Sequence, residues 1–202
     1  MVKIKFCGLR RIEDIRYVNI LDIDYAGFVF SKSKRIVNKD QARMLIENLD
    51  PEIKRVGVFV NEEINFVTDV AKSLYLDVVQ LHGEETDEYI DSLKSLLNIE
   101  VWKAIRIRIN EDIRIPEKAD KILLDTFVVG LPGGSGIPFD WNSVSNMNLN
   151  KPFFLAGGLN YLNVERAIEI LKPYGVDVSS GIETDGYKDF EKMRLFVEKV
   201  RE

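Results

Sequence analysis

Short apolar, β-branched runs alternate with amphipathic stretches of helical periodicity from one end of the chain to the other. In the first run, alternation places Ile4 and Phe6 on one face of a strand and Lys3, Lys5 and Cys7 on the other. The stretch that follows carries apolar residues at helical spacing. The same reasoning along the chain predicts eight strands, over residues 3–7, 25–30, 55–60, 77–81, 100–105, 121–125, 152–156 and 176–179.

Helices are predicted between these strands by the 3.6-residue spacing of apolar positions. Asn61 is expected to cap the third helix at its amino end. The segment 106–120 carries Pro116 and is short and irregular, so a loop is predicted in place of the fifth helix. The predicted helices cover residues 11–21, 39–48, 62–73, 85–97, 163–171 and 189–200, with a short one over 139–147.

Eight strand–helix units without a break in composition predict an α/β protein with a parallel sheet, as a single domain over residues 1–202. Eight is the number of units that closes a (β/α)8 TIM barrel, and 202 residues lies near the short end for that fold. An open doubly wound sheet is the alternative, and periodicity does not separate the two. We favour the barrel.

Composition narrows the class of protein. A hydrophobic content of 46% with 30% charged residues is typical of a soluble globular protein, and a net charge of −5 argues against nucleic-acid binding. One cysteine excludes an internal disulfide framework, and one histidine leaves little for a metal site. The chain begins with a strand instead of an apolar signal segment, and no run reaches the length of a membrane span. We therefore expect a cytoplasmic protein.

Two reactive side chains stand at predicted strand ends, where a barrel builds its active site. Cys7 ends the first strand on a face that carries lysines, and a nearby cation favours thiolate over thiol. Asp125 ends the sixth strand, where an apolar run stops. Each has a plainer interpretation. Cys7 could be a small buried hydrophobe, and Asp125 could be a helix cap.

Two further polar residues lie in predicted loops at the same rim. Arg35 closes the charged run 32–35 after the second strand, and His82 follows the fourth. A solvated loop and a surface turn are the plainer interpretations. A basic loop at the mouth of a phosphate site would also attract an anionic ligand.

Glycine-rich turns follow the last three strands. Gly157-Gly158 follows the seventh strand, Ser180-Gly181 the eighth, and Gly133-Gly134-Ser135-Gly136 the sixth. Such turns offer bare backbone N–H groups to a phosphate, although each one alone is an ordinary way to end a strand. Their joint position predicts a phosphate site.

The motifs also match a known family in order and over essentially the whole chain. The matching stretches are Lys5-Phe6-Cys7-Gly8, Gly27-Phe28-Val29-Phe30, Ser33-Lys34-Arg35, Val56-Gly57-Val58-Phe59-Val60-Asn61, Val79-Gln80-Leu81-His82-Gly83, Leu124-Asp125, Gly133-Gly134-Ser135-Gly136, Phe139-Asp140-Trp141, Leu155-Ala156-Gly157-Gly158-Leu159 and Val176-Asp177-Val178-Ser179-Ser180-Gly181-Ile182-Glu183. Together they resemble phosphoribosylanthranilate isomerase, the (β/α)8 enzyme of tryptophan biosynthesis. The opening cysteine motif separates this family from other phosphate-binding barrels.

The resemblance implies an Amadori rearrangement of N-(5-phosphoribosyl)anthranilate to 1-(2-carboxyphenylamino)-1-deoxyribulose 5-phosphate, without metal or organic cofactor. In the family, the residue matching Cys7 is the general base and that matching Asp125 the general acid. The arginine matching Arg35 contacts the anthranilate carboxylate, and the turns matching Gly157-Gly158 and Ser180-Gly181 bind phosphate.

His82 and Asp177 complete the set of expected substrate-binding residues. The chain departs from the family in small ways. Leu9-Arg10 stands where Ile-Thr is commoner, and Lys32 and Lys34 occupy a loop that often holds proline. These changes alter the charge and stiffness of the loops.

The chemistry fits the residues independently. An acid must protonate the furanose oxygen, and a base must then remove a proton from the carbon next to the iminium. Asp125 therefore needs a raised pKa and Cys7 a lowered one. We expect Lys5 to supply part of that effect on Cys7. Asp177 is its expected partner, because an unpaired ammonium inside the barrel would be costly.

Two other functions stay open. The histidine-pathway isomerase performs the same rearrangement on a different aminoribose, but it uses two aspartates, which the cysteine at the first strand end disfavours. A barrel that binds phosphosugars as a regulatory module is the non-enzymatic alternative. The expected partner is a small phosphosugar, with no nucleic acid or membrane, and the protein is expected to be a monomer or a homodimer.

Overall fold

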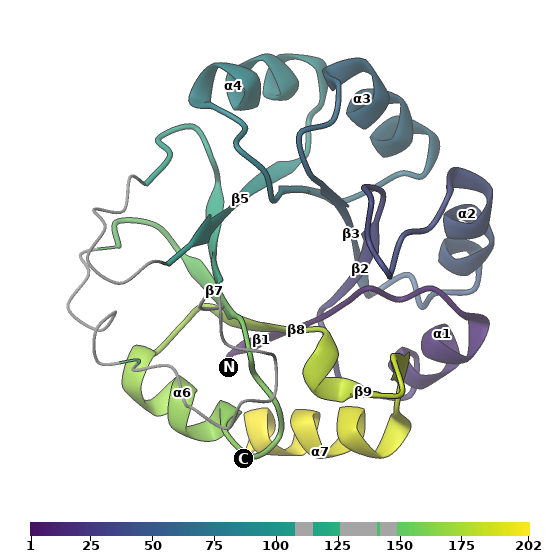
Figure 1. Cartoon of the computed structure of the whole chain (residues 1–202), viewed down its shortest axis with the longest axis vertical. Coiled ribbons are helices and arrows are strands. Elements are labelled where there is room, and N and C mark those ends of the chain that lie inside the picture. The colour runs from purple at the N-terminus through teal and green to yellow at the C-terminus, as the bar shows by residue number, and fades with distance from the viewer. Residues whose placement is uncertain (108–114, 126–140, 142–148) are drawn as a thin grey trace.

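Eight parallel strands close into a barrel in which β1 pairs with both β2 and β8 (Figure 1). The structure is a computed structural model and describes residues 1–107, 115–125, 141 and 149–202. Closure confirms the barrel and excludes the open sheet. The strands are β1 (Lys3–Cys7), β2 (Tyr25–Val29), β3 (Lys54–Phe59), β4 (Val78–Leu81), β5 (Glu100–Arg106), β6 (Lys121–Asp125), β7 (Phe153–Ala156) and β8 (Gly175–Val178).

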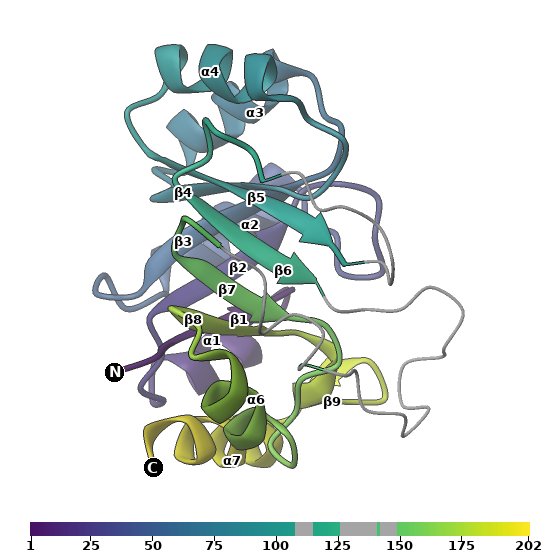
Figure 2. The same cartoon turned by 90° about the vertical axis from the view of Figure 1, so that its left-hand side faces the viewer.

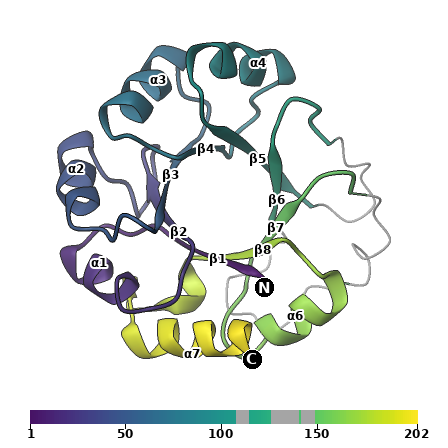
Figure 3. The ribbon, with the colours of Figure 1, turned by 180° about the vertical axis from the view of Figure 1, so that it is seen from behind.

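Helices surround the barrel on its outside, as Figures 1 and 3 show from its two ends. Their apolar faces pack against the outer faces of the strands, for example Phe196 against Phe6 with ring centroids 5.9 Å apart. In the described part of the chain, no helix combines the length and the apolar character needed to cross a membrane. The helices are α1 (Ile12–Val18), α2 (Lys39–Glu47), α3 (Ile64–Ser73), α4 (Asp87–Leu96), α6 (Val164–Leu171) and α7 (Phe190–Arg201).

The predicted cap of the third helix is wrong. Asn61 has a left-handed φ of 53°, and its side-chain oxygen accepts a hydrogen bond from the Glu84 N–H at 2.7 Å. The helix starts later, with Glu63 as N-cap. Because the amide of Asn61 ties two loops together, it is not available to the helix.

Three predictions concern the segments between β5 and β7. Residues 107 and 115–120 of the connection between β5 and β6 are not helical, and 108–114 lie outside the described residues. The glycine loop 133–136 also lies outside them, as does the short helix expected over 139–147, apart from residue 141.

Aromatic side chains fill the barrel interior. Trp102 stacks on Phe154 with centroids 4.5 Å apart, and the ring of Tyr25 meets Trp102 edge-on at 5.0 Å. All three are 2% exposed or less, and burying each side chain contributes about 1.5–3 kcal/mol. The interior is therefore packed, and the space for a ligand lies at the strand ends.

A short hairpin follows β8 and was not predicted. After the 3-10 turn η1 (Ser180–Ile182) come β9 (Glu183–Thr184) and β10 (Tyr187–Lys188), which pair antiparallel. In Figure 2, β9 lies at the end of the barrel to which β5, β6 and β7 point, and both chain termini lie at the other end. The hairpin therefore stands at the rim where a barrel enzyme carries its active site.

Candidate active site

Cys7 ends β1, and its thiol lies above a buried ion pair. The Nζ atom of Lys5 donates to Oδ1 of Asp177 at 2.8 Å, with the Lys5 side chain fully buried. This contact confirms the predicted pairing. Burial lowers the pKa of Lys5, but Asp177 and Cys7 raise it by more, so the net shift is upward. Lys5 is therefore protonated beneath the thiol.

The pKa of Cys7 is raised, so the expectation of a lowered value is wrong in this structure. Burial of the thiol is the largest cause, and Asp177 acts in the same direction. Lys5 and Lys188 lower the pKa of Cys7, but not enough to offset burial. The sequence pattern identified the neighbouring charges but not the loss of water around the sulfur.

Asp125 and His82 come together from the ends of β6 and β4. Nε2 of His82 lies 3.2 Å from Oδ2 of Asp125, and the amide nitrogen of Gln80 lies 3.4 Å from Nδ1. In the tautomer with its proton on Nε2, the ring accepts at Nδ1 from the Gln80 amide and donates to the Asp125 carboxylate. His82 therefore orients Asp125.

The loop that carries His82 is held by a buried carboxylate. Glu85 accepts hydrogen bonds from the backbone N–H groups of Asn61 at 2.8 Å and Gly83 at 2.9 Å. The same carboxylate also lies 3.1 Å from Nζ of Lys103. A cavity of about 490 Å³ opens beside this loop, lined by His82, Lys103 and neighbouring residues. Space for a ligand therefore adjoins the His82 side of the rim.

Arg35 reaches over β1 and forms a bidentate pair with Glu183 of β9. Its Nε and Nη2 atoms each donate to one carboxylate oxygen of Glu183 at 2.7 Å. Gly8, with φ of 78°, makes room for this path, because a β-carbon there would lie 2.3 Å from Cδ of Arg35. Glu183 thus occupies the Nε–Nη2 edge of the guanidinium, and Nη1 with the second N–H of Nη2 forms the edge that could meet a ligand carboxylate at this rim.

Glu183 also binds a second cation, Lys188 of β10, at 2.8 Å. Burial raises the pKa of Glu183, but Arg35 and Lys188 lower it by more, so the carboxylate is ionised. Sequence reasoning assigned no role to either residue. The Asp185-Gly186 pair was the available signal, since such a pair favours a tight hairpin that returns the chain to the rim.

The two predicted glycine turns after β7 and β8 touch each other. Gly157 and Gly158 have φ of 88° and 67°, and nothing lies within 4 Å of a β-carbon built on Gly158. A β-carbon on Gly181 would lie 1.8 Å from the carbonyl oxygen of Leu159. Only glycine fits that contact, which brings the two turns together beside an open space.

The second turn is tied to the thiol strand. The Ser179 hydroxyl, next to Ser180, donates to the carbonyl oxygen of Cys7 at 3.0 Å. The predicted turns therefore adjoin the Cys7 side of the rim. Among the described residues, no group of three or more His, Cys, Asp or Glu side chains is arranged to hold a metal ion.

Comparison with known proteins agrees with this geometry. The family model for N-(5'-phosphoribosyl)anthranilate (PRA) isomerase matches residues 4–199. This chain belongs to the phosphoribosylanthranilate isomerase family. Relatives carrying the name N-(5'-phosphoribosyl)anthranilate isomerase include those of Thermoanaerobacter pseudethanolicus, 54% identical over 100% of this chain and 98% of the relative, and Acetivibrio thermocellus, 50% identical over 100% and 97%.

Solved structures of the family superpose closely. A phosphoribosyl anthranilate isomerase in complex with reduced 1-(o-carboxyphenylamino)-1-deoxyribulose 5-phosphate has a TM-score of 0.85 at 37% identity, covering 100% of this chain and 99% of that one. Family membership over nearly the whole chain decides against the histidine-pathway isomerase and the non-enzymatic barrel as interpretations of this site.

Proposed function

We propose that this chain converts N-(5-phosphoribosyl)anthranilate to 1-(2-carboxyphenylamino)-1-deoxyribulose 5-phosphate, with Asp125 as general acid and Cys7 as general base. The observation that carries the activity is the family match over residues 4–199. The assignment of roles to side chains rests on their chemistry and on their positions at the strand ends of one barrel.

The acid step opens the sugar ring. The protonated carboxyl of Asp125 donates a proton to the furanose oxygen, the bond from that oxygen to C1 breaks, and the nitrogen lone pair forms an iminium. The hydrogen bond between His82 and Oδ2 of Asp125 helps to hold the carboxyl in one orientation.

The base step removes the proton from C2. The Cys7 thiolate accepts it, and the electron pair of the C–H bond forms a C1–C2 double bond while the iminium nitrogen becomes neutral. The enol that results takes up a proton at C1 and loses its hydroxyl proton to give the ketone. Because the iminium is a cation beside the sulfur, it favours the thiolate when it is needed and offsets the effect of burial.

Substrate binding divides between the two ends of the ligand. Arg35 binds the carboxylate of the anthranilate ring through Nη1 and the second N–H of Nη2, while Glu183 holds the opposite edge of the guanidinium in place. The backbone N–H groups of Gly157-Gly158 and Ser180-Gly181 bind the phosphate, and the contact between the turns supports a shared site. Asp177 acts indirectly, by holding Lys5 beneath the thiol.

A fluorescence assay of substrate loss tests this function. We expect the wild-type chain to consume phosphoribosylanthranilate, and Cys7→Ala and Asp125→Asn each to lower kcat by about 10²–10⁴-fold. Wild-type loss no faster than the spontaneous background would exclude the activity. Variants as fast as the wild type would exclude the assigned roles and leave the activity standing.

The oligomeric state and the cellular location are still predictions, namely a monomer or homodimer in the cytoplasm. A structure from Thermotoga maritima, 37% identical with a TM-score of 0.83, is described as a monomer generated from a dimeric isomerase of this family. That likeness supports testing the homodimer first, by light scattering of the purified chain.

A further inference from the structure

Lys188, at the end of β10, is a buried lysine with three hydrogen-bond contacts and no assigned role. It is 4% exposed, and its ammonium lies 2.9 Å from the carbonyl oxygen of Ser179, 3.4 Å from the Ser179 hydroxyl and 2.8 Å from Oε1 of Glu183. An ammonium has three N–H donors. A buried lysine bound in this way has a fixed position.

Two chains of contacts lead from this ammonium to the proposed substrate site. Through Ser179, whose hydroxyl donates to the Cys7 carbonyl at 3.0 Å, it reaches the strand end of the base. Through Glu183, which holds both nitrogens of the Arg35 fork, it reaches the proposed carboxylate site. One side chain therefore links the base, the β8 turn and the arginine.

Lys188 also has an electrostatic effect on the thiol of Cys7. Lys5 from β1 lowers the pKa of Cys7 more than Lys188 does, and its partner Asp177 from β8 opposes part of that effect. Arg35 and Lys188 share one carboxylate, that of Glu183 on β9, which leaves one positive charge in excess. Lys188 and Lys5 are the lysines that lower the pKa of Cys7, against burial and Asp177.

Glu183 opposes the loss of charge on Lys188. Burial, the largest cause, lowers the pKa of Lys188, and Arg35 acts in the same direction. The Glu183 carboxylate raises the pKa of Lys188 through both its charge and its hydrogen bond, and the net shift is downward. The Glu183 carboxylate therefore holds both Arg35 and Lys188 in place.

We propose that Lys188 is a positioning residue for this reaction, whose ammonium favours the thiolate of Cys7 and fixes the relative positions of Cys7, Arg35 and the β8 turn. The inference rests on the proposed role of Cys7 as the base.

Alkylation of the thiol by iodoacetamide across pH tests it without measuring turnover. Cys7 is the only cysteine of the chain, so the midpoint of the alkylation rate reports a single site. Lys188→Gln keeps a donor and loses the charge, and we expect its midpoint to rise by about one pH unit. Lys188→Arg keeps the charge, and its midpoint should stay near that of the wild type.

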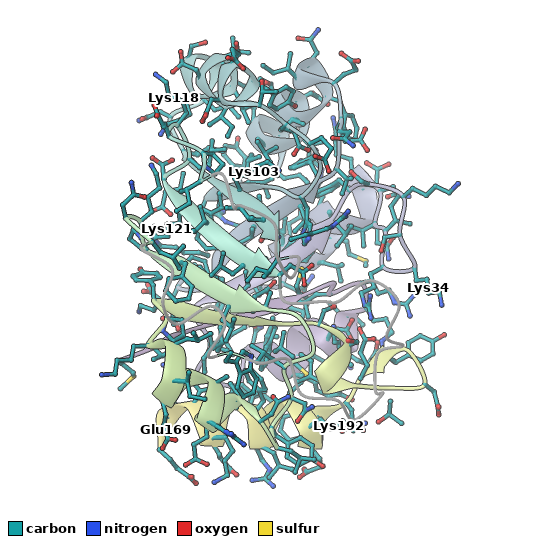
Figure 4. All side chains as sticks on the ribbon, turned by 60° about the vertical axis from the view of Figure 1, so that its left-hand side comes forward. Lys34, Lys103, Lys118, Lys121, Glu169 and Lys192 are labelled. Atoms are coloured by element: carbon teal, nitrogen blue, oxygen red, sulfur yellow. The ribbon has the colours of Figure 1, made fainter. Side chains whose placement is uncertain are left out.

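Lys192 of α7 supplies a matched control (Figure 4). It also binds Glu183, but at the main-chain carbonyl, 2.7 Å away. Lys192→Gln should therefore leave both the midpoint and kcat unchanged. In Lys188→Gln, kcat should fall about tenfold through the base, and KM should rise through Arg35.

Two results would overturn the proposal. A midpoint for Lys188→Gln equal to that of the wild type would show that the ammonium has no effect on the thiol. An equal rise in Lys188→Arg would show that packing, instead of charge, is the cause. If Lys188→Gln does not fold, Lys188→Met fills the same buried space with an apolar chain and is judged by the same two results. Full turnover of Cys7→Ala would overturn the base assignment separately.

Discussion

Gly27 of β2 lies opposite Cys7 of β1, and a β-carbon on Gly27 would stand 3.0 Å from the sulfur. The same atom would lie 3.2 Å from Nζ of Lys5. The backbone of β2 therefore forms the wall against which the thiol and the ammonium pack. A side chain at this position would compete with the proposed base for space.

Gly27→Ala should displace the thiol and the ammonium. We expect kcat to fall by about tenfold or more, since small misplacements of catalytic groups are costly, and the free energy of unfolding to fall by about 1–3 kcal/mol. Gly175→Ala is the control, because its β-carbon would lie 2.3 Å from the Phe154 ring, inside the packed interior. It should lower stability and leave kcat per folded molecule unchanged. An equal loss of kcat in both variants would refute a local effect at the thiol.

Arg35→Lys should separate carboxylate binding from chemistry. Lysine lacks the planar fork, so we expect KM to rise about tenfold with a smaller change in kcat. Arg55 forms the same kind of bidentate pair with Asp77, at 2.7 and 2.9 Å, at the start of β3 and away from the site. Arg55→Lys should leave KM unchanged in steady-state kinetics. A KM for Arg35→Lys close to that of the wild type would show that Arg35 does not bind the carboxylate of the substrate.

His82→Leu should impair the acid step by removing the hydrogen bond at Oδ2 that helps to orient Asp125. We expect kcat to fall by about 10–100-fold with little change in KM, because His82 is proposed to orient the acid instead of holding substrate. His82→Gln places an amide N–H near the position of Nε2 and should recover part of the loss. Single-turnover rates at saturating substrate distinguish these cases. A change confined to KM would instead support direct substrate binding by His82.

The strands and the main pairings could be predicted because they depend on local alternation. The period-two pattern of β1 placed Lys5 inside the barrel and so predicted its ion pair with Asp177, a contact between the first and last strands. The bounds of β1 and β6 agree with the prediction to the residue. In a closed barrel, alternation fixes which side chains share the interior.

The roles of Glu183 and Lys188 were not predictable in the same way. Their strands have two residues each, too few to show a period, and both side chains are significant only because a hairpin returns them to the rim. The raised pKa of Cys7 was missed for a related reason. It depends on the balance between burial and charges from three strands, which no local pattern contains.

Asp24 directly precedes β2, and its protonation at low pH should destabilise the folded protein. It accepts hydrogen bonds from Nζ of Lys3 at 2.6 Å, the Ile4 N–H at 2.8 Å and Arg201 at 3.2 Å. Burial raises the pKa of Asp24, but Lys3, Ile4 and Arg201 lower it by more. A carboxylate whose folded pKa lies below its unfolded value stabilises the protein above the unfolded pKa, about 3.9, and this contribution is lost as pH falls through the folded pKa.

Asp24→Asn should therefore lower the free energy of unfolding by about 1.5–3 kcal/mol at pH 7, the range for hydrogen bonds to charged groups. Below about pH 4 the difference from the wild type should shrink, because protonation removes the same charge from the wild-type residue. Asp22→Asn is the control. Asp22 pairs with the same Arg201 but is 73% exposed, so its loss should lower stability by less than about 1 kcal/mol. Urea unfolding at stepwise pH measures both variants, and a difference between Asp24→Asn and the wild type that stays constant down to pH about 2.5 would contradict the ionic origin of the stabilisation.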